Sequence, residues 1–350
     1  MRSLVYYGTE DLRLVDSRIP EPGPGEVRVA VAACGVCGSD AAELDHGPVL
    51  TRPPVILGHE FVGVVDAVGE GVDDFSEGAR VVCGAGVSCG ECEPCGRGRT
   101  NLCDSYRTAG LTIDGGLAEY VVVPREILHD VSESTLTLDT LALTQPMAIA
   151  VHAARQGAVG ADDVVAIVGA GGIGTFLTAV AVQWARRVIV LDIDDDRLEL
   201  ARRLGAQATF NPARGDAGAL VDELRSRIDT VFEVSGTASG FATALSLLRR
   251  GGTLVPVGIQ RSDIAAPLGE WTVREISVVG TNALVFAEDI PDAVRLLEAS
   301  SLWDMVAPEV ITLEQTVAEG LDPLRRGTSS RIKTLVDPAA RRPRRAVHSG

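Results

Sequence analysis

The stretch that most constrains the fold is a glycine-rich turn between a predicted strand and a predicted helix. Residues 163–168, an aspartate followed by five apolar residues, predict a buried strand. Residues 169–174 follow the pattern G-x-G-x-x-G, and an apolar helix is expected through Trp184. A second predicted strand, 188–191, ends at Asp192. The glycine pattern alone is weak, but in the order strand, glycines, helix, strand, acid it is a dinucleotide-binding fingerprint. The sequence therefore predicts a doubly wound parallel sheet, a Rossmann domain.

The residues of the turn share one expected role, which is to hold a cofactor pyrophosphate on the helix N-terminus: Gly169, Gly171, Gly172, Ile173 and Gly174. Asp192 lies 18 residues beyond Gly174, where a carboxylate can accept both ribose hydroxyls. That carboxylate would repel a 2′-phosphate, so NAD is favoured over NADP. Arg197 could stack on the adenine or meet a phosphate, and its alternative interpretation is a solvated helix residue.

Cysteine spacing adds a second constraint. Four of the seven cysteines follow the spacing C-x2-C-x2-C-x7-C with glycine and proline between them: Cys89, Cys92, Cys95 and Cys103. Four thiolates at this spacing can wrap a tetrahedral zinc and leave no open position, which makes a structural site. The odd number of cysteines and the absence of a signal peptide argue against a disulfide framework.

Two short motifs upstream carry candidate metal ligands. Cys37 opens the run Cys-Gly-Ser-Asp, which places Ser39 and Asp40 beside it, and His59 and Glu60 follow a glycine. An isolated His-Glu pair is more often a hydrogen-bonded part of the core than a metal site. The presence of Cys37 upstream favours metal binding here. Short strands from residue 1 to 33 predict a β-rich domain around these motifs. The remaining cysteines, Cys34 and Cys83, are interpreted as small buried residues.

Together these motifs resemble the zinc-containing alcohol dehydrogenases of the medium-chain dehydrogenase/reductase superfamily, and the nearest pattern is the butanediol and sorbitol dehydrogenase branch. The resemblance covers residues 1–336. It implies an α/β chain with a GroES-like β-rich catalytic domain at 1–148 and 286–337, a structural-zinc lobe at 83–104, and a Rossmann NAD-binding domain at 149–285. The tail 338–350 is rich in Ala, Pro and Arg and is predicted to be disordered.

The resemblance implies a mechanism with two zinc ions per chain. Cys37 and His59 ligate the catalytic zinc, and Glu60 is either a third ligand or an outer residue. Asp40 orients His59, and Ser39 passes the proton of the alcohol outward. A zinc with one open position lowers the pKa of a bound alcohol, and hydride then leaves the carbinol carbon for the nicotinamide.

The sequence departs from the family at two positions. Relatives carry a histidine for the proton relay where this chain has Ala42, so the relay ends at Ser39 and water or uses His46 instead. Polyol and butanediol dehydrogenases usually carry a zinc-facing glutamate where this chain has Gln145. Because an amide is a poorer ligand than a carboxylate, we expect Glu60 to carry more of the coordination.

Further assignments come from the resemblance. Ser235, Val257 and Gly258 lie at two strand exits that contact the nicotinamide in the family, partly through backbone groups. A strand at 276–280 forms the subunit contact in relatives, which implies a homodimer or homotetramer. Lys333, the single lysine beside 31 arginines, either binds a cofactor phosphate or is an exposed strand residue.

Composition excludes other classes. The net charge of −16 argues against nucleic acid as a partner. No run approaches the roughly 20 apolar residues that a membrane span needs, and the N-terminus lacks a signal peptide, so a cytoplasmic location is expected. The prediction is NAD-linked oxidation of a secondary alcohol, diol or polyol. Alternatives are an aldose or biosynthetic-pathway dehydrogenase, and a catalytically silent NAD-binding relative.

Overall fold

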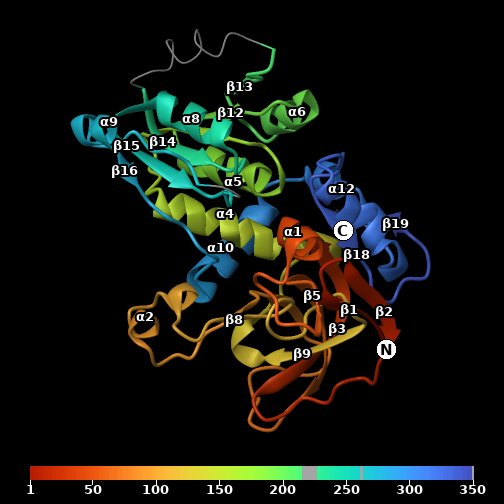
Figure 1. Cartoon of the computed structure of the whole chain (residues 1–350). Helices are drawn as coiled ribbons and strands as arrows, with labels where there is room; N and C mark the ends of the chain where they lie inside the picture. Colours follow the sequence, from red (N-terminus) through yellow and green to blue (C-terminus); the bar gives the residue numbers. More distant parts are fainter. Residues whose placement is uncertain (215–226, 261–262, 349–350) are drawn as a thin grey trace. The chain divides into compact units, whose positions relative to one another are not determined.

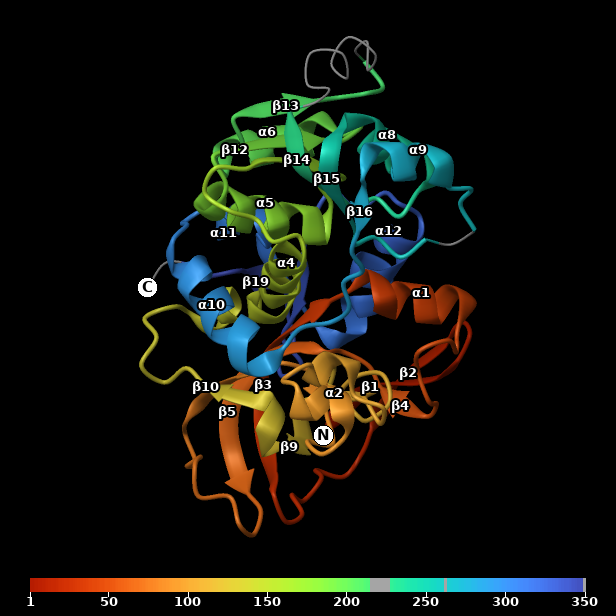
Figure 2. The same ribbon diagram turned by 90° about the vertical axis from the view of Figure 1, so that its left-hand side faces the viewer.

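A computed structural model describes residues 1–214, 227–260 and 263–348. The chain forms two compact units, Met1–Gln145 with Leu284–Gly350, and Pro146–Ala283 (Figures 1 and 2). The first is rich in strands and the second carries a parallel sheet, so the predicted α/β class with a GroES-like and a Rossmann part is confirmed. The predicted boundaries were 1–148 with 286–337, and 149–285.

The second unit contains one six-stranded sheet in the order β13-β12-β11-β14-β15-β16, and every neighbouring pair is parallel. Its strands are β11 (Val164–Val168), β12 (Arg187–Leu191), β13 (Ala208–Phe210), β14 (Ile228–Glu233), β15 (Leu248–Pro256) and β16 (Ser277–Val278). Its helices are α5 (Gly172–Trp184), α6 (Asp195–Arg203), α8 (Ala238–Leu247) and α9 (Leu268–Arg274).

The local sequence explains why these segments form this sheet. Every residue of β11 is buried, as expected of an apolar β-branched run covered on both faces of a parallel sheet. α5 begins at Gly172, within the fingerprint motif, and ends at Trp184 as predicted. The sheet order is that of two mononucleotide-binding halves placed side by side, with the order reversing between β11 and β14.

The first unit contains a three-stranded sheet, β2-β1-β4, an eight-stranded sheet, β10-β6-β5-β3-β18-β17-β19, in which β9 also pairs with β3, and a two-stranded sheet, β7-β8. Its strands are β1 (Arg2–Gly8), β2 (Asp11–Asp16), β3 (Glu26–Val36), β4 (Val55–Ile56), β5 (Glu60–Val68), β6 (Arg80–Cys83), β7 (Gly86–Val87), β8 (Arg107–Thr108), β9 (Tyr120–Pro124), β10 (Leu128–Asp130), β17 (Glu309–Ile311), β18 (Thr334–Val336) and β19 (Arg344–Arg345).

Short helices connect these strands. They are α1 (Gly38–His46), α2 (Glu93–Gly96), α3 (Leu138–Leu141), α10 (Phe286–Glu298), α11 (Trp303–Val306) and α12 (Asp322–Arg325), with 3₁₀ turns at Thr100–Leu102, Arg125–Ile127 and Leu313–Gln315 and a π-helical turn at Thr316–Leu321. α4 (Thr144–Gln156) begins in the first unit and continues into the second. No described helix is long and apolar enough to cross a membrane.

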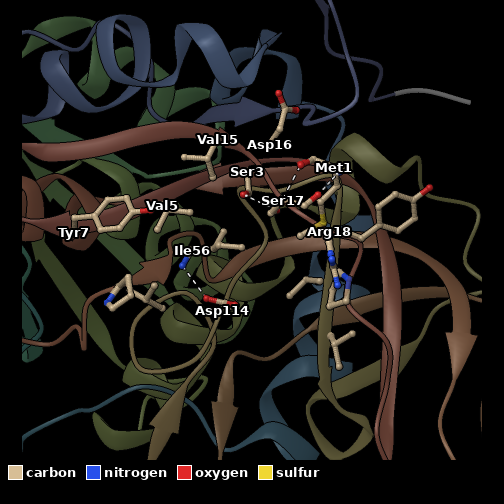
Figure 3. A pocket seen from close by; sticks show the side chains of 16 residues that line it. Met1, Ser3, Val5, Tyr7, Val15, Asp16, Ser17, Arg18, Ile56 and Asp114 are labelled. Atoms are coloured by element: carbon tan, nitrogen blue, oxygen red, sulfur yellow. Dashed lines mark hydrogen bonds between the residues drawn. The ribbon is translucent and has the colours of Figure 1, made fainter.

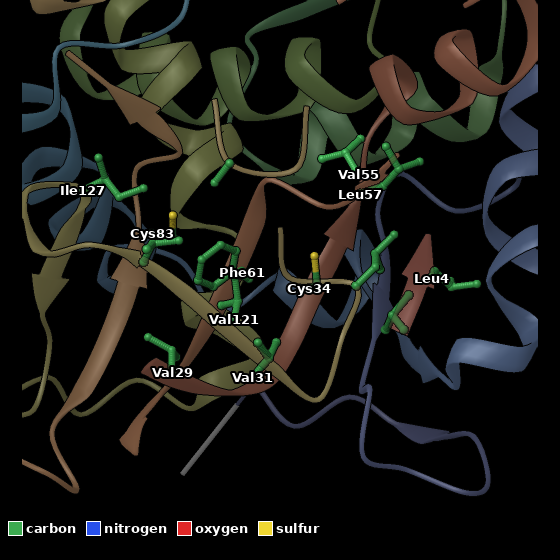
Figure 4. Packing of buried hydrophobic residues seen from close by; sticks show 14 of the residues in the cluster. Leu4, Val29, Val31, Cys34, Val55, Leu57, Phe61, Cys83, Val121 and Ile127 are labelled. Carbon is green, nitrogen blue, oxygen red and sulfur yellow. The ribbon is translucent and has the colours of Figure 1, made fainter. Parts of the chain in front are cut away.

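The core of the first unit is built by strand alternation. In β3 the first seven residues alternate between half-buried and buried, so one face packs inward. Figure 4 shows side chains of β3, β5 and β9 meeting in this core. Cys34 and Cys83 are among its members, which confirms that they are small buried residues rather than ligands of either site.

The tail differs from its prediction, because residues 338–348 are ordered; 349–350 lie outside the described residues. β19 pairs antiparallel with β17. Arg344 makes two hydrogen bonds, of 2.6 and 2.8 Å, to the carboxylate of Asp139, which is buried. The predicted disorder was wrong here because a bidentate pair with a buried acid holds the segment, which composition does not reveal.

Candidate zinc sites and cofactor-binding turn

Cys37 lies at the point where the long strand β3 ends and α1 begins. It is the N-cap residue of α1, in extended backbone conformation. Asp40, fully buried in the first turn of α1, accepts a hydrogen bond of 2.9 Å from the Cys37 backbone N–H. This carboxylate satisfies one of the free N–H groups at the helix N-terminus and fixes the direction in which the Cys37 thiol leaves the strand.

His59 lies against α1, with both ring nitrogens facing it. Its Nδ1 is 3.5 Å from Asp40 Oδ1, and its Nε2 is 3.3 Å from Ser39 Oγ. Asp40 Oδ1 and His59 Nδ1 are buried, and no described residue hydrogen-bonds to either atom. An acid behind one ring nitrogen leaves the other nitrogen available to a metal, which is the usual arrangement around a ligating histidine.

Glu60 opens β5 and is buried beside these groups. Both of its carboxylate oxygens accept hydrogen bonds of 2.7 Å from Lys333 Nζ, which also donates to the backbone oxygen of Val36 at 3.2 Å. Lys333 is 5% exposed. Its interpretation as an exposed strand residue was therefore wrong. Its contact with a cofactor phosphate stays a prediction.

The thiol, imidazole and carboxylate converge on one point. One ligand atom from each of Cys37, His59 and Glu60 lies within 4.8 Å of the other two. Burial lowers the pKa of His59, but the negative charges of Asp40 and Cys37 outweigh it and raise that pKa well above its ordinary value. A field that attracts a proton so strongly would also attract a divalent cation, and a sulfur–nitrogen–oxygen donor set suits zinc.

The departures from the family have a partial structural account. His46 lies at the exposed end of α1 and pairs with Asp45 at 3.0 Å. It is seven residues from Ser39, which is about 10 Å along a helix axis, so it does not extend a relay from that hydroxyl. Ala42 adds no polar group to α1. Gln145 is buried in the first turn of α4, and its contact with the metal stays a prediction.

The four spaced cysteines form a second cluster. Their sulfur atoms lie within 4.8 Å of one another, in a segment that runs from β7 through α2 to β8. Backbone N–H groups of Glu91 and Cys92 lower the pKa of Cys89 to about 7. Cys103 Sγ accepts from the N–H groups of Cys89 and Ser105 at 3.2 and 3.4 Å. Donors of this kind favour thiolates, and four thiolates fit a closed zinc site.

In the second unit, the fingerprint turn has the geometry that its glycines predict. Gly169 has φ of +104°, a conformation that residues with side chains rarely adopt. A Cβ on Gly174 would lie 1.9 Å from the backbone oxygen of Gly169, so the third glycine allows α5 to approach the strand end. Gly171 is the N-cap of α5 and Gly172 and Ile173 begin it, which leaves free N–H groups for a phosphate.

Asp192 follows β12 and its carboxylate shapes the neighbouring turns. One oxygen accepts from the Ala170 N–H at 2.6 Å and the other from the Asp194 N–H at 2.9 Å. Each oxygen keeps a further lone pair for a ribose hydroxyl. Arg197 pairs with Asp194 at 3.7 Å, and its guanidinium lies beside Gly171. Its contact with a nucleotide stays a prediction.

Two groups of functional interest were missed by sequence reasoning. One is the Lys333–Glu60 pair. The other is Glu43, which is buried in α1 and accepts hydrogen bonds from the N–H groups of Val49, Leu50 and Thr51 and from the Thr51 hydroxyl. It fixes the loop after α1. The only sequence signal for Glu43 was an acidic residue followed by a turn within ten residues.

A surface hollow of about 540 Å³ lies elsewhere in the first unit, among residues of β1, β2, β4 and β9 (Figure 3). One of its acids, Asp114, accepts a hydrogen bond of 2.9 Å from the Ile56 N–H. None of the candidate zinc ligands lines it. We assign it no part in the chemistry.

Comparison with known proteins places these sites in a family. The family model described as alcohol dehydrogenase GroES-like domain matches residues 23–133, and the one described as zinc-binding dehydrogenase matches residues 172–299. D-xylulose reductase A of Aspergillus niger is 35% identical over 291 residues, which are 80% of this chain and 81% of the relative.

Two solved structures are similar over nearly the whole chain. A zinc-binding dehydrogenase from Sinorhizobium meliloti 1021, bound to NADP, has a TM-score of 0.87 and 31% identity, covering 96% of this chain and 99% of that one. The 2R,3R-butanediol dehydrogenase from Bacillus subtilis has a TM-score of 0.87 and 27% identity with the same coverage. The chain therefore belongs to the zinc-containing alcohol dehydrogenases of the medium-chain dehydrogenase/reductase superfamily and is an oxidoreductase.

Proposed function

We propose that this protein oxidises a secondary alcohol, diol or polyol to the ketone with NAD⁺, and catalyses the reverse reaction with NADH. The observation that carries the proposal is the convergence of Cys37, His59 and Glu60 within 4.8 Å, with buried Asp40 behind His59. Zinc held by Cys37 and His59 would act as a Lewis acid on the substrate oxygen, and the nicotinamide would accept hydride.

The residues around this site supply orientation and a proton path. Asp40 Oδ1, 3.5 Å from His59 Nδ1, would orient the ring of His59 when the metal is bound. Ser39 Oγ, 3.3 Å from His59 Nε2, is placed to receive the alcohol proton and pass it to water, because Ala42 offers no further relay group. Lys333 holds Glu60 through both oxygens. Glu60 therefore either remains an outer residue or uses a remaining lone pair to ligate the metal.

The cofactor assignment rests on Asp192. Its carboxylate stands at the end of β12, where the adenosine ribose lies in sheets of this order, and a negative group there disfavours a 2′-phosphate. Arg197 nearby could offset that repulsion, and the Sinorhizobium meliloti structure holds NADP. We propose NAD as the preferred cofactor, with the ratio of the two affinities as the quantity to measure.

The substrate class follows from the relatives. One is named a D-xylulose reductase and another a butanediol dehydrogenase. Both names describe interconversion of a secondary alcohol and a ketone. Gln145 stands where such enzymes usually carry glutamate, so aldoses belong in the test as well.

The test is a panel of diols, polyols and aldoses assayed with NAD⁺ and NADP⁺ on protein whose zinc content has been counted. We expect two zinc ions per chain and NAD⁺-dependent oxidation of at least one diol or polyol. Turnover on aldoses alone would move the assignment to a sugar dehydrogenase. One zinc and no turnover on any compound would identify a catalytically silent relative.

We also propose a homodimer or homotetramer in the cytoplasm. The strand β16 is exposed at one edge of the six-stranded sheet, where a second copy can add its own edge. A four-thiolate site requires reduced cysteines, which a reducing compartment maintains. Light scattering of the purified protein tests the assembly, and a monomer at micromolar concentration would contradict it.

A further inference from the structure

A buried acid at the end of β14 has no part in the function proposed so far. Glu233 is fully buried. Its carboxylate accepts hydrogen bonds from the Ser235 N–H at 2.9 Å, the Gly236 N–H at 3.2 Å and Gln260 Nε2 at 2.7 Å, and from the Ser235 hydroxyl. All of these partners are neutral donors. Within residues 1–214, 227–260 and 263–348, no ion pair involves Glu233.

The same residue joins the ends of two neighbouring strands. Its side chain holds the turn after β14, while its backbone oxygen accepts from the Val257 and Gly258 N–H groups after β15, at 2.8 and 2.9 Å. The two turns are in close contact, because a Cβ on Gly258 would lie 2.3 Å from the Gly236 nitrogen. Glu233 therefore places a negative charge directly beneath both strand exits.

The topology indicates which part of the cofactor lies there. In a sheet of this order, the dinucleotide crosses the carboxyl ends of the strands at the point where the order reverses. Asp192 marks the adenosine half on the β12 side, and the turn before α5 marks the pyrophosphate. The nicotinamide half then extends over the exits of β14 and β15, which are the turns that Glu233 holds.

We propose that Glu233 is a positioning residue whose charge favours the oxidised cofactor over the reduced one. The inference rests on the proposed function. When hydride leaves the carbinol carbon, its C–H bond breaks, a C–H bond forms at the nicotinamide ring, and the alcohol releases a proton. The ring loses its positive charge in this step. A buried anion with neutral partners attracts the charged ring more than the neutral one, so NAD⁺ binds more tightly relative to NADH.

The measurement is the dissociation constant of NAD⁺, NADH and ADP-ribose for the zinc-loaded wild type and for Glu233→Gln, by isothermal titration calorimetry. We expect the ratio Kd(NAD⁺)/Kd(NADH) to rise on the order of tenfold in Glu233→Gln. ADP-ribose lacks the nicotinamide, so its Kd should change by less than about twofold when only the charge effect operates.

Two further variants separate charge from structure. Gln260→Leu removes a hydrogen bond to Glu233 but leaves its charge, and should leave the ratio unchanged. Gln260→Lys places a cation beside Glu233 and should raise the ratio as Glu233→Gln does, which keeps the test decisive if Glu233→Gln fails to fold.

The outcomes are distinct. An unchanged ratio in Glu233→Gln and Gln260→Lys, with NAD⁺ still bound, overturns the proposal. Equal weakening of all three ligands also overturns it, because Glu233 would then be only a structural clamp. Failure of the wild type to bind ADP-ribose or NAD⁺ would instead remove the proposed function on which the inference rests.

Discussion

The two candidate zinc sites are built in different ways. The four-cysteine cluster takes all of its ligands from residues 89–103, and its cysteines range from exposed to buried. The Cys37, His59 and Glu60 cluster draws on the end of β3, the start of β5 and, through Lys333, on a residue 273 positions from Glu60. Its acid–base partners, Asp40 and Lys333, are buried.

This difference matters for function. A local loop can fold around a metal with little help from the rest of the chain, and four thiolates leave no position for a substrate. The mixed site holds a thiol, an imidazole and a carboxylate in the buried part of the first unit, beside the charges of Asp40 and Lys333. The energy of each buried charge there depends on its charged neighbours. The comparison predicts that damage to the local site lowers stability, whereas damage to the mixed site removes activity.

The largest effect is expected at the mixed site itself. His59→Ala should reduce the zinc count by one and lower kcat/KM by about 10³-fold or more, because Lewis-acid stabilisation is worth several kcal/mol. Elemental analysis and steady-state kinetics measure both. The matched control is His129→Ala, which is outside both clusters. Retained activity in His59→Ala would contradict the claim that damage to the mixed site removes activity.

The next effect concerns the buried ion pair between Lys333 and Glu60. In zinc-free protein, Lys333→Met leaves Glu60 buried without a cation and should reduce the free energy of unfolding by about 3–5 kcal/mol. Urea unfolding measures it. Arg331→Met, which removes the more exposed pair with Glu309, is the control and should cost less than about 1 kcal/mol.

Adding Glu60→Gln to Lys333→Met should recover part of that loss, because the unpaired charge is then gone. Similar losses for Lys333→Met and Arg331→Met would show that Lys333 does not hold Glu60 as described. The zinc count of Glu60→Ala tests whether Glu60 ligates the metal. Unchanged zinc and unchanged activity would exclude Glu60 as a ligand.

The local site should show a smaller effect of another kind. Cys103→Ser should reduce the zinc count by one and lower the melting temperature by roughly 5–10 °C, as a loss of about 2–3 kcal/mol would in a unit of this size. Turnover per remaining catalytic zinc should stay within a few fold. Cys83→Ser, a buried cysteine outside the cluster, should leave the zinc count unchanged.

The smallest effect concerns cofactor choice. Asp192→Asn should raise the KM for NAD⁺ by about tenfold and change the KM for NADP⁺ less, because the lost negative charge no longer repels the 2′-phosphate. The ratio of the two kcat/KM values is the readout. An unchanged ratio would indicate that Arg197, rather than Asp192, sets the preference.

Features with local sequence signals were predicted well. The strand, glycine turn and helix around Gly169–Gly174 and the spacing of the four cysteines each lie within a short segment, so the residues that form them are visible together. The end of α5 and the extents of the strands β11 and β12 follow the predictions closely. The family itself was predicted from these motifs and is confirmed by the comparisons.

Features that depend on distant partners were not predicted. Lys333 has no sequence signal that links it to Glu60, because the contact forms only when β18 pairs with β3. The order of the tail similarly depends on Arg344 meeting Asp139, which lies 205 residues earlier. Glu43 and Glu233 look like ordinary acids in the sequence, and only their burial and donors indicate a role.

The central claim is that Cys37 and His59 bind a zinc distinct from the four-cysteine zinc. The most direct measurement is anomalous X-ray diffraction at the zinc absorption edge from crystals of the zinc-loaded protein. The account predicts two peaks per chain, one bonded to Cys37 Sγ and His59 Nε2 and one among Cys89, Cys92, Cys95 and Cys103. A single peak at the four cysteines, in protein that oxidises an alcohol with NAD⁺, would contradict it.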